Sequence, residues 1–76
     1  MNKLRRKALN ELKDQLENIM LQLEDIQSEE EDYRDNMPEN FQGSERYDRA
    51  DEAASNIEDA VSSIEEAISS IESAVE

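Results

Sequence analysis

Carboxylates are the side chains of this chain with the greatest capacity for chemistry. Asp and Glu account for 21 of the 76 residues, against eight Lys and Arg and no His. Two carboxylates can act as general acid and base, but only in a desolvated pocket that separates their pKa values. A short chain rich in helix formers offers no such pocket, and it has neither a phosphate-binding loop nor a nucleophile paired with a base. We therefore expect a protein that is not an enzyme and binds no cofactor.

The densest acidic cluster, residues 29–32 together with Asp35, is a candidate calcium site. An EF-hand loop needs Asp or Asn at alternating positions and a Gly at the sixth. Here Arg34 interrupts the spacing and no Gly follows in register. We expect a solvated helix end and no metal site, the more so because Cys and His are absent.

The net charge of −13 bears on the class of partner. It repels nucleic acid and anionic membranes, so we expect direct contact with neither, and a basic protein surface is the natural complement. No uncharged run approaches the ~20 residues of a membrane-spanning helix. The basic start, residues 3–7, lacks the apolar run that would follow it in a signal peptide. These features predict a soluble intracellular protein.

Two heptad repeats predict the elements that carry these side chains. In the first half, apolar residues alternate spacings of three and four, which is typical of a coiled-coil seam. This first seam comprises Leu9, Leu12, Leu16, Ile19, Leu23 and Ile26. The second seam comprises Ala50, Ala54, Ile57, Val61, Ile64, Ile68, Ile71 and Val75. Beside it, Ala recurs at every seventh position from Ala53 to Ala74, so a partner helix can approach closely on that side.

The segment between the repeats holds the only Pro and the only Gly of the chain. Pro38 disfavours helical backbone at the residue ahead of it, and Ser44 suits a helix N-cap. We predict one domain over residues 1–76, with helices over about 3–35 and 44–76 and a loop over 36–43. The fold class is all-α, an antiparallel two-helix coiled-coil hairpin.

The distribution of charge favours the same antiparallel pairing. Folding back would place the basic N-terminus beside the acidic end of the second helix, at Glu65, Glu66, Glu72 and Glu76. It would also place Arg46 and Arg49 beside the acidic end of the first helix. Such exposed pairs add little stability, but they select one orientation over the other.

Met20 and Leu21 project away from the first seam, so the hairpin is expected to expose them. They can be isolated surface residues, which are common, or a stripe for self-association. Because a hairpin core is one seam wide, dimerisation into a four-helix bundle would bury it better. A homodimer is the favoured assembly, with Met20 and Leu21 as its candidate contacts.

All three aromatic residues and one Met cluster near the loop. They are Tyr33, Met37, Phe41 and Tyr47. The favoured interpretation is that they cap the open end of the hairpin. Because aromatic and Met side chains are also good binding anchors, Met37, Phe41 and Tyr47 are candidate partner-binding residues.

The loop and the second helix also resemble a known group of proteins. The segment Met37-Pro38-Glu39-Asn40-Phe41-Gln42, followed by Ser44-Glu45-Arg46 and a repeat of Ile-Glu-Asp/Glu-Ala, is similar to short acidic helical proteins. These are encoded in phages and mobile elements of Gram-positive bacteria, and most have no assigned function. The resemblance implies a location in the cytoplasm of a bacterial host cell and no particular activity.

Two functional hypotheses remain. In the first, the chain is an acidic protein-binding module, a phage-type inhibitor or DNA mimic that acts on a basic nucleic-acid-handling protein. Its candidate contacts on the second helix are Glu58, Asp59, Glu65, Glu66 and Glu72. In the second, the chain is a structural or assembly element with no role in DNA mimicry. Charge substitutions at these five residues would weaken partner binding by a DNA mimic and would leave assembly nearly unaffected.

Overall fold

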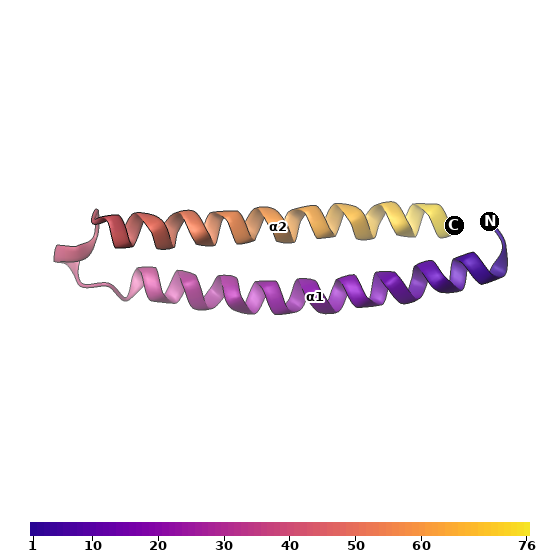
Figure 1. Cartoon of the computed structure of the whole chain (residues 1–76), viewed down its shortest axis with the longest axis horizontal. Helices are drawn as coiled ribbons and strands as arrows, with labels where there is room; N and C mark the ends of the chain where they lie inside the picture. Colours follow the sequence, from indigo (N-terminus) through magenta and orange to yellow (C-terminus); the bar gives the residue numbers. More distant parts are fainter.

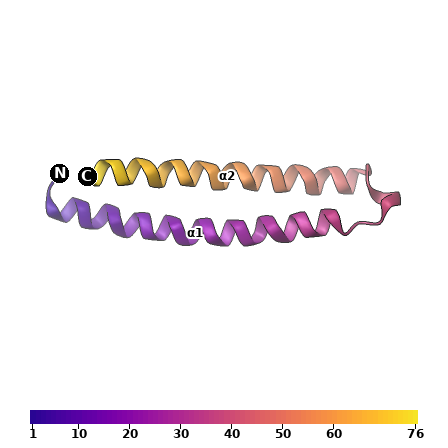
Figure 2. The same cartoon turned by 180° about the vertical axis from the view of Figure 1, so that it is seen from behind.

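A computed structural model describes all 76 residues and shows two long helices folded against each other. Helix α1 spans Lys3–Asp35, a single 3-10 turn η1 spans Glu39–Phe41, and helix α2 spans Glu45–Val75. The helices run antiparallel side by side, with both termini at one end and the loop at the other (Figures 1 and 2). The molecule is a rod of 59 × 14 × 13 Å. The predicted all-α hairpin is confirmed.

Polar side chains begin both helices. The side chain of Asn2 accepts a hydrogen bond from the backbone N–H of Arg5 at 2.8 Å. The hydroxyl of Ser44 accepts one from the backbone N–H of Tyr47 at 3.3 Å, so Ser44 is the predicted N-cap and α2 begins one residue later. Each cap satisfies a donor that has no partner within its helix.

The loop reverses the chain through two special residues. Helix α1 ends two residues before Met37, as expected from the constraint that Pro38 places on its neighbour. Gly43 then adopts a φ of +90°, which L side chains rarely adopt. A Cβ at this position would meet no atom within 4 Å, so only the backbone conformation requires Gly here.

We expect Gly43→Ala to lower the free energy of unfolding by about 1 kcal/mol, because an L residue at positive φ is strained by about that amount. Thermal denaturation followed by circular dichroism measures the change. Gly43→Asn should cost less, because Asn tolerates positive φ better than Ala does. Equal losses for the two variants would show that the loop relaxes to another conformation.

The core is a single narrow seam. Only five residues are buried, at 3–9% exposure, and none is polar. They are Met37, Ala50, Ala54, Val61 and Ile68. Four of the five come from the predicted seam of α2, whose remaining members are half-buried. No residue of α1 is fully buried.

The seam of α1 differs from the prediction. Leu9, Leu16 and Leu23 are half-buried against α2, but Leu12, Ile19 and Ile26 are 46–50% exposed. The other half of the seam is a row offset by one residue. It consists of Lys13, Met20, Gln27 and Arg34, all half-buried. The long stems of these side chains cover the small residues of α2 while their polar ends reach water.

Heptad spacing does not distinguish the two rows of α1, and the row that faces α2 is the one whose Arg34 pairs with Asp51. Both rows keep coiled-coil spacing relative to Leu9, Leu16 and Leu23, so either can complete the seam. One partner helix covers only one stripe, and the second stripe then remains uncovered. Neither helix contains a stretch long and apolar enough to cross a membrane.

Candidate protein-binding surface

One ion pair across the hairpin shows the register of α1 against α2. Nη1 of Arg34 donates to Oδ1 of Asp51 at 2.7 Å. Successive heptads in opposite directions then place Gln27 level with Glu58, and Met20 level with Glu65. The last pair is confirmed by a shallow hollow that both residues line. One side of the hairpin therefore carries this row of α1 next to an acidic row of α2.

We call this side the acidic flank. It comprises Glu17, Glu24 and Glu31 of α1 and Asp51, Glu58, Glu65 and Glu72 of α2. Members of each row are seven residues apart, so a carboxylate recurs about every 10 Å along each helix. All seven are half-buried or exposed. Of these seven, Asp51 alone forms an ion pair.

Arg34 is the basic residue that joins the two helices. Besides Asp51, its Nε donates to Oδ1 of Asp35 at 2.9 Å. The hydrogen bonds to Asp35 and Asp51 raise the pKa of the guanidinium above its ordinary value, so it stays charged. A charged guanidinium therefore lies between the carboxylates of Asp35 and Asp51 at the loop end of the hairpin.

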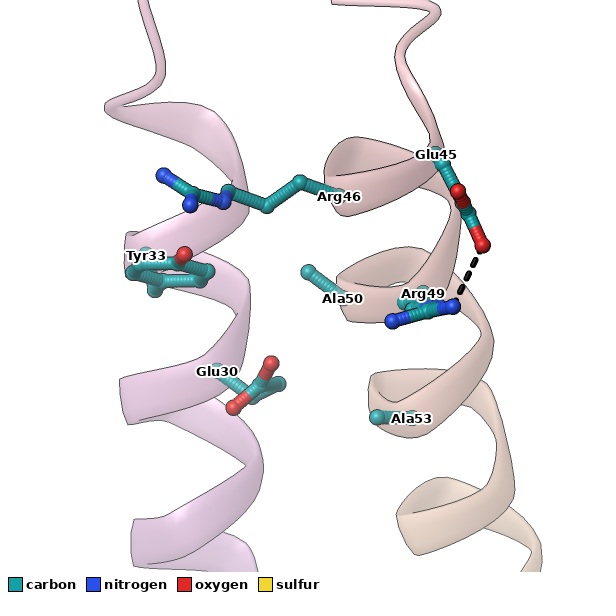
Figure 3. Close-up of a pocket in the computed structure, with 7 residues that line it drawn as sticks. All are labelled: Glu30, Tyr33, Glu45, Arg46, Arg49, Ala50 and Ala53. Carbon is teal, nitrogen blue, oxygen red and sulfur yellow. Dashed lines mark hydrogen bonds and ion pairs between the residues drawn. The ribbon is translucent and has the colours of Figure 1, made fainter.

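The expected placement of the basic N-terminus beside α2 was wrong, whereas Arg46 and Arg49 do lie beside Glu30 at the acidic end of α1 but form no ion pair with it. No ion pair joins residues 3–7 to α2, because the first turns of α1 project past the end of α2 (Figure 1). Arg49 pairs within its own helix with Glu45. Arg46 instead crosses from α2 to lie above the ring of Tyr33 (Figure 3). The basic N-terminal turns are thus left without carboxylate partners.

The structure separates the five acidic candidates of α2. Glu58, Glu65 and Glu72 lie on the acidic flank, beside the row of α1 that contains Met20. Asp59 and Glu66 are exposed one position further around the helix, on the side away from α1. Sequence reasoning missed the α1 members and Asp51. Their seven-residue spacing was visible, but the assignment required the correct seam on α1.

The loop candidates occupy different environments. Met37 is buried at 9% exposure and belongs to the core, so it is not available as a surface anchor. Tyr47 is half-buried in the first turn of α2. Phe41 is 49% exposed and lines a hollow with Tyr33 and Met37. The structure therefore brings Tyr33, Met37 and Phe41 together around one hollow, which Tyr47 does not line, and leaves Phe41 as the exposed candidate for a partner.

The two self-association candidates, Met20 and Leu21, line the same hollow but differ in burial. Met20 is half-buried and shares a hollow with Glu65 and Ile68 of α2, so it faces the partner helix instead of projecting away from it. Leu21 is 57% exposed, as expected. The larger apolar surface lies on the opposite side of the hairpin.

No group of three or more Asp and Glu residues is placed to hold a metal ion. The carboxylates of the acidic flank are spread along the rod instead of converging on a point. Such an arrangement suits an extended basic surface. Comparison of the chain with protein-family models, with curated proteins and with solved structures found no match.

Proposed function

We propose that this chain is a non-enzymatic protein-binding module that presents its acidic flank to a basic surface of a partner protein. The observation that carries the proposal is the placement of seven carboxylates on one side of a rod, six of them without an ion-pair partner. Unpaired surface charges of one sign steer a complementary partner and set its orientation.

A phage-type inhibitor or DNA mimic is the narrower form of this proposal. Twenty-one carboxylates along 59 Å give one per about 2.8 Å, whereas duplex DNA carries one charge per ~1.7 Å. The chain therefore has a lower density of negative charge than duplex DNA. A basic nucleic-acid-handling protein remains the partner class that this surface fits best, in line with the phage-type resemblance of the loop and α2.

The first test compares two triple variants with the same change in charge. Neutralising Glu58, Glu65 and Glu72 to Gln removes the α2 row of the acidic flank. Its control neutralises Glu52, Asp59 and Glu66 to Gln or Asn on the side of α2 that faces away from α1, where all three are exposed. We expect the flank variant to weaken partner binding about tenfold or more and the control to weaken it by less than threefold.

The measurement begins with capture of partners from a bacterial lysate on tagged protein, followed by titration of the purified partner. Elution with duplex DNA at constant ionic strength tests the narrower form, because a DNA mimic and DNA compete for one site. Binding through the flank should also weaken as salt rises, since screening acts on exposed charges. Equal losses for the two triple variants contradict the proposed surface, and a partner that ignores DNA contradicts mimicry alone.

The alternative, a structural or assembly element, is favoured by a different observation. The side of the hairpin opposite the acidic flank exposes a continuous apolar stripe. An assembly role predicts that substitutions in this stripe abolish function while both triple charge variants retain it. The two functions therefore predict loss of function from substitutions on different sides of the rod.

A further inference from the structure

The side of the hairpin opposite the acidic flank carries a row of exposed apolar side chains from Leu12 to Tyr33. Tyr33 of α1 lines a hollow there with Ala50 and Ala53 of α2, and the charged side chains of Glu30, Glu45, Arg46 and Arg49 border it at the loop end (Figure 3). Heptad steps from these residues place Ile26 level with Ile57, and Ile19 level with Ile64. We call this surface the apolar flank. It comprises Leu12, Ile19, Ile26 and Tyr33 of α1 and Ile57, Ile64 and Ile71 of α2.

The α1 row of this surface keeps a constant orientation. Its four side chains are exposed by 50, 46, 49 and 50% from Leu12 to Tyr33. A row that neither turns inward nor outward over three heptads is what a partner following the same supercoil requires. On α2, Ala60, Ala67 and Ala74 border the same flank and are exposed, so α1 does not use the close approach that they allow.

We propose that the apolar flank binds a second copy of this chain, in a four-helix bundle whose two hairpins run antiparallel. The inference is independent of the proposed function, because it concerns the other side of the rod. The homodimer expected from the sequence is retained, with a different set of contacts. The acidic flanks of both copies then face outward.

The size of the surface fits such a dimer. A side of 59 by 14 Å has a planar footprint of about 800 Å², the size of one partner's share of a standard interface, and the apolar flank, about 32 Å from Leu12 to Tyr33, occupies roughly half of it as the core inside a polar rim. A short partner helix would cover only part of this length. A second copy matches it from end to end and supplies the same heptad spacing.

The two ends of the hairpin carry different charges, and this difference selects the orientation. Residues 28–56, at the loop end, hold ten acidic and three basic residues, for a net charge of −7. Residues 1–15 and 69–76, at the open end, hold four acidic and five basic residues, for a net charge of +1. Parallel packing would place two ends of −7 together, whereas antiparallel packing places each beside an end of +1. The unpaired basic turns of α1 then lie near the acidic loop end of the other copy.

The test uses a pair of substitutions two residues apart in α1. Ile19→Lys places a charge at the centre of the apolar flank, and Leu21→Lys makes the same change on the outer side, at 57% exposure. Sedimentation equilibrium should give twice 8.8 kDa for the natural sequence and for Leu21→Lys. Ile19→Lys should weaken dimerisation about a hundredfold or more, because two-fold symmetry buries the new charge twice.

Three results would overturn the assignment of the apolar flank. They are a natural chain that is monomeric at about 100 µM, a Leu21→Lys variant that dissociates as readily as Ile19→Lys, and an Ile19→Lys variant that stays dimeric. Raising the salt concentration should strengthen the dimer by screening the repulsion between two chains of −13. That response is opposite in sign to the one expected for binding through the acidic flank.

The relative orientation of the two hairpins is measured in the intact dimer. The result therefore does not depend on whether a monomeric variant folds. The chain has no Cys, and a spin label on Gln42→Cys reports one position in the exposed loop. In the antiparallel dimer the two labels lie near opposite ends of the 59 Å rod. In a parallel dimer they lie within about 20 Å, twice the usual distance between packed helices. A short distance between the labels overturns the antiparallel arrangement.

Discussion

Val61→Asp should unfold much of the hairpin. Val61 is 7% exposed at the middle of the seam, level with Leu23 of α1. A carboxylate there has no cation to pair with, and an unpaired buried charge costs about 3 kcal/mol or more. For a domain of this size, that loss lowers the melting temperature by about 12–24 °C. The helical signal in far-ultraviolet circular dichroism measures it during a thermal scan.

The matched control is Ser62→Asp, which adds the same charge to the next residue of α2. Ser62 is exposed, and substitutions of exposed residues usually change stability by less than about 0.5 kcal/mol. If both variants melt at the same temperature, charge repulsion along α2, and not burial in the seam, dominates the stability.

Met37→Ala should lower the free energy of unfolding by about 2 kcal/mol or more. Met37 is 9% exposed and is the only buried residue outside α2, so its side chain closes the loop end of the core. Truncating a buried Met to Ala costs about 2–5 kcal/mol, of which part is the cavity left behind. Urea denaturation at a fixed protein concentration measures the loss.

Phe41→Ala separates the capping role from partner binding. Phe41 is 49% exposed, so its truncation should cost about 1 kcal/mol or less. If Phe41 is a binding anchor, this variant keeps its stability and loses affinity for the captured partner. A loss of stability as large as that of Met37→Ala would instead show that Phe41 stabilises the loop end by packing against the core.

Local physical chemistry was sufficient to predict the helices and the reversal between them. Pro38, Gly43 and Ser44 act on the backbone within a few residues, so their effects can be read without knowing what lies across the hairpin. The seam of α2 was also predictable, because Ala54, Val61 and Ile68 belong to the single apolar stripe of that helix.

The sequence by itself did not determine which stripe of α1 faces α2. Two stripes share Leu9, Leu16 and Leu23, and heptad spacing accepts both. Only the tertiary structure decided between them, by placing Met20 against α2 and Arg34 against Asp51. A rotation of α1 by one row exchanges a buried side chain for an exposed one at every heptad.

That rotation also decided the location of both candidate surfaces. The carboxylates of α1 joined those of α2 on one flank, and Leu12, Ile19 and Ile26 joined the Ile row of α2 on the other. Composition and spacing had already determined an acidic rod with an excess of apolar surface. Which side of the hairpin carries that surface depended on contacts between residues about 17 to 60 positions apart in the chain. Such contacts exist only once the two helices have packed.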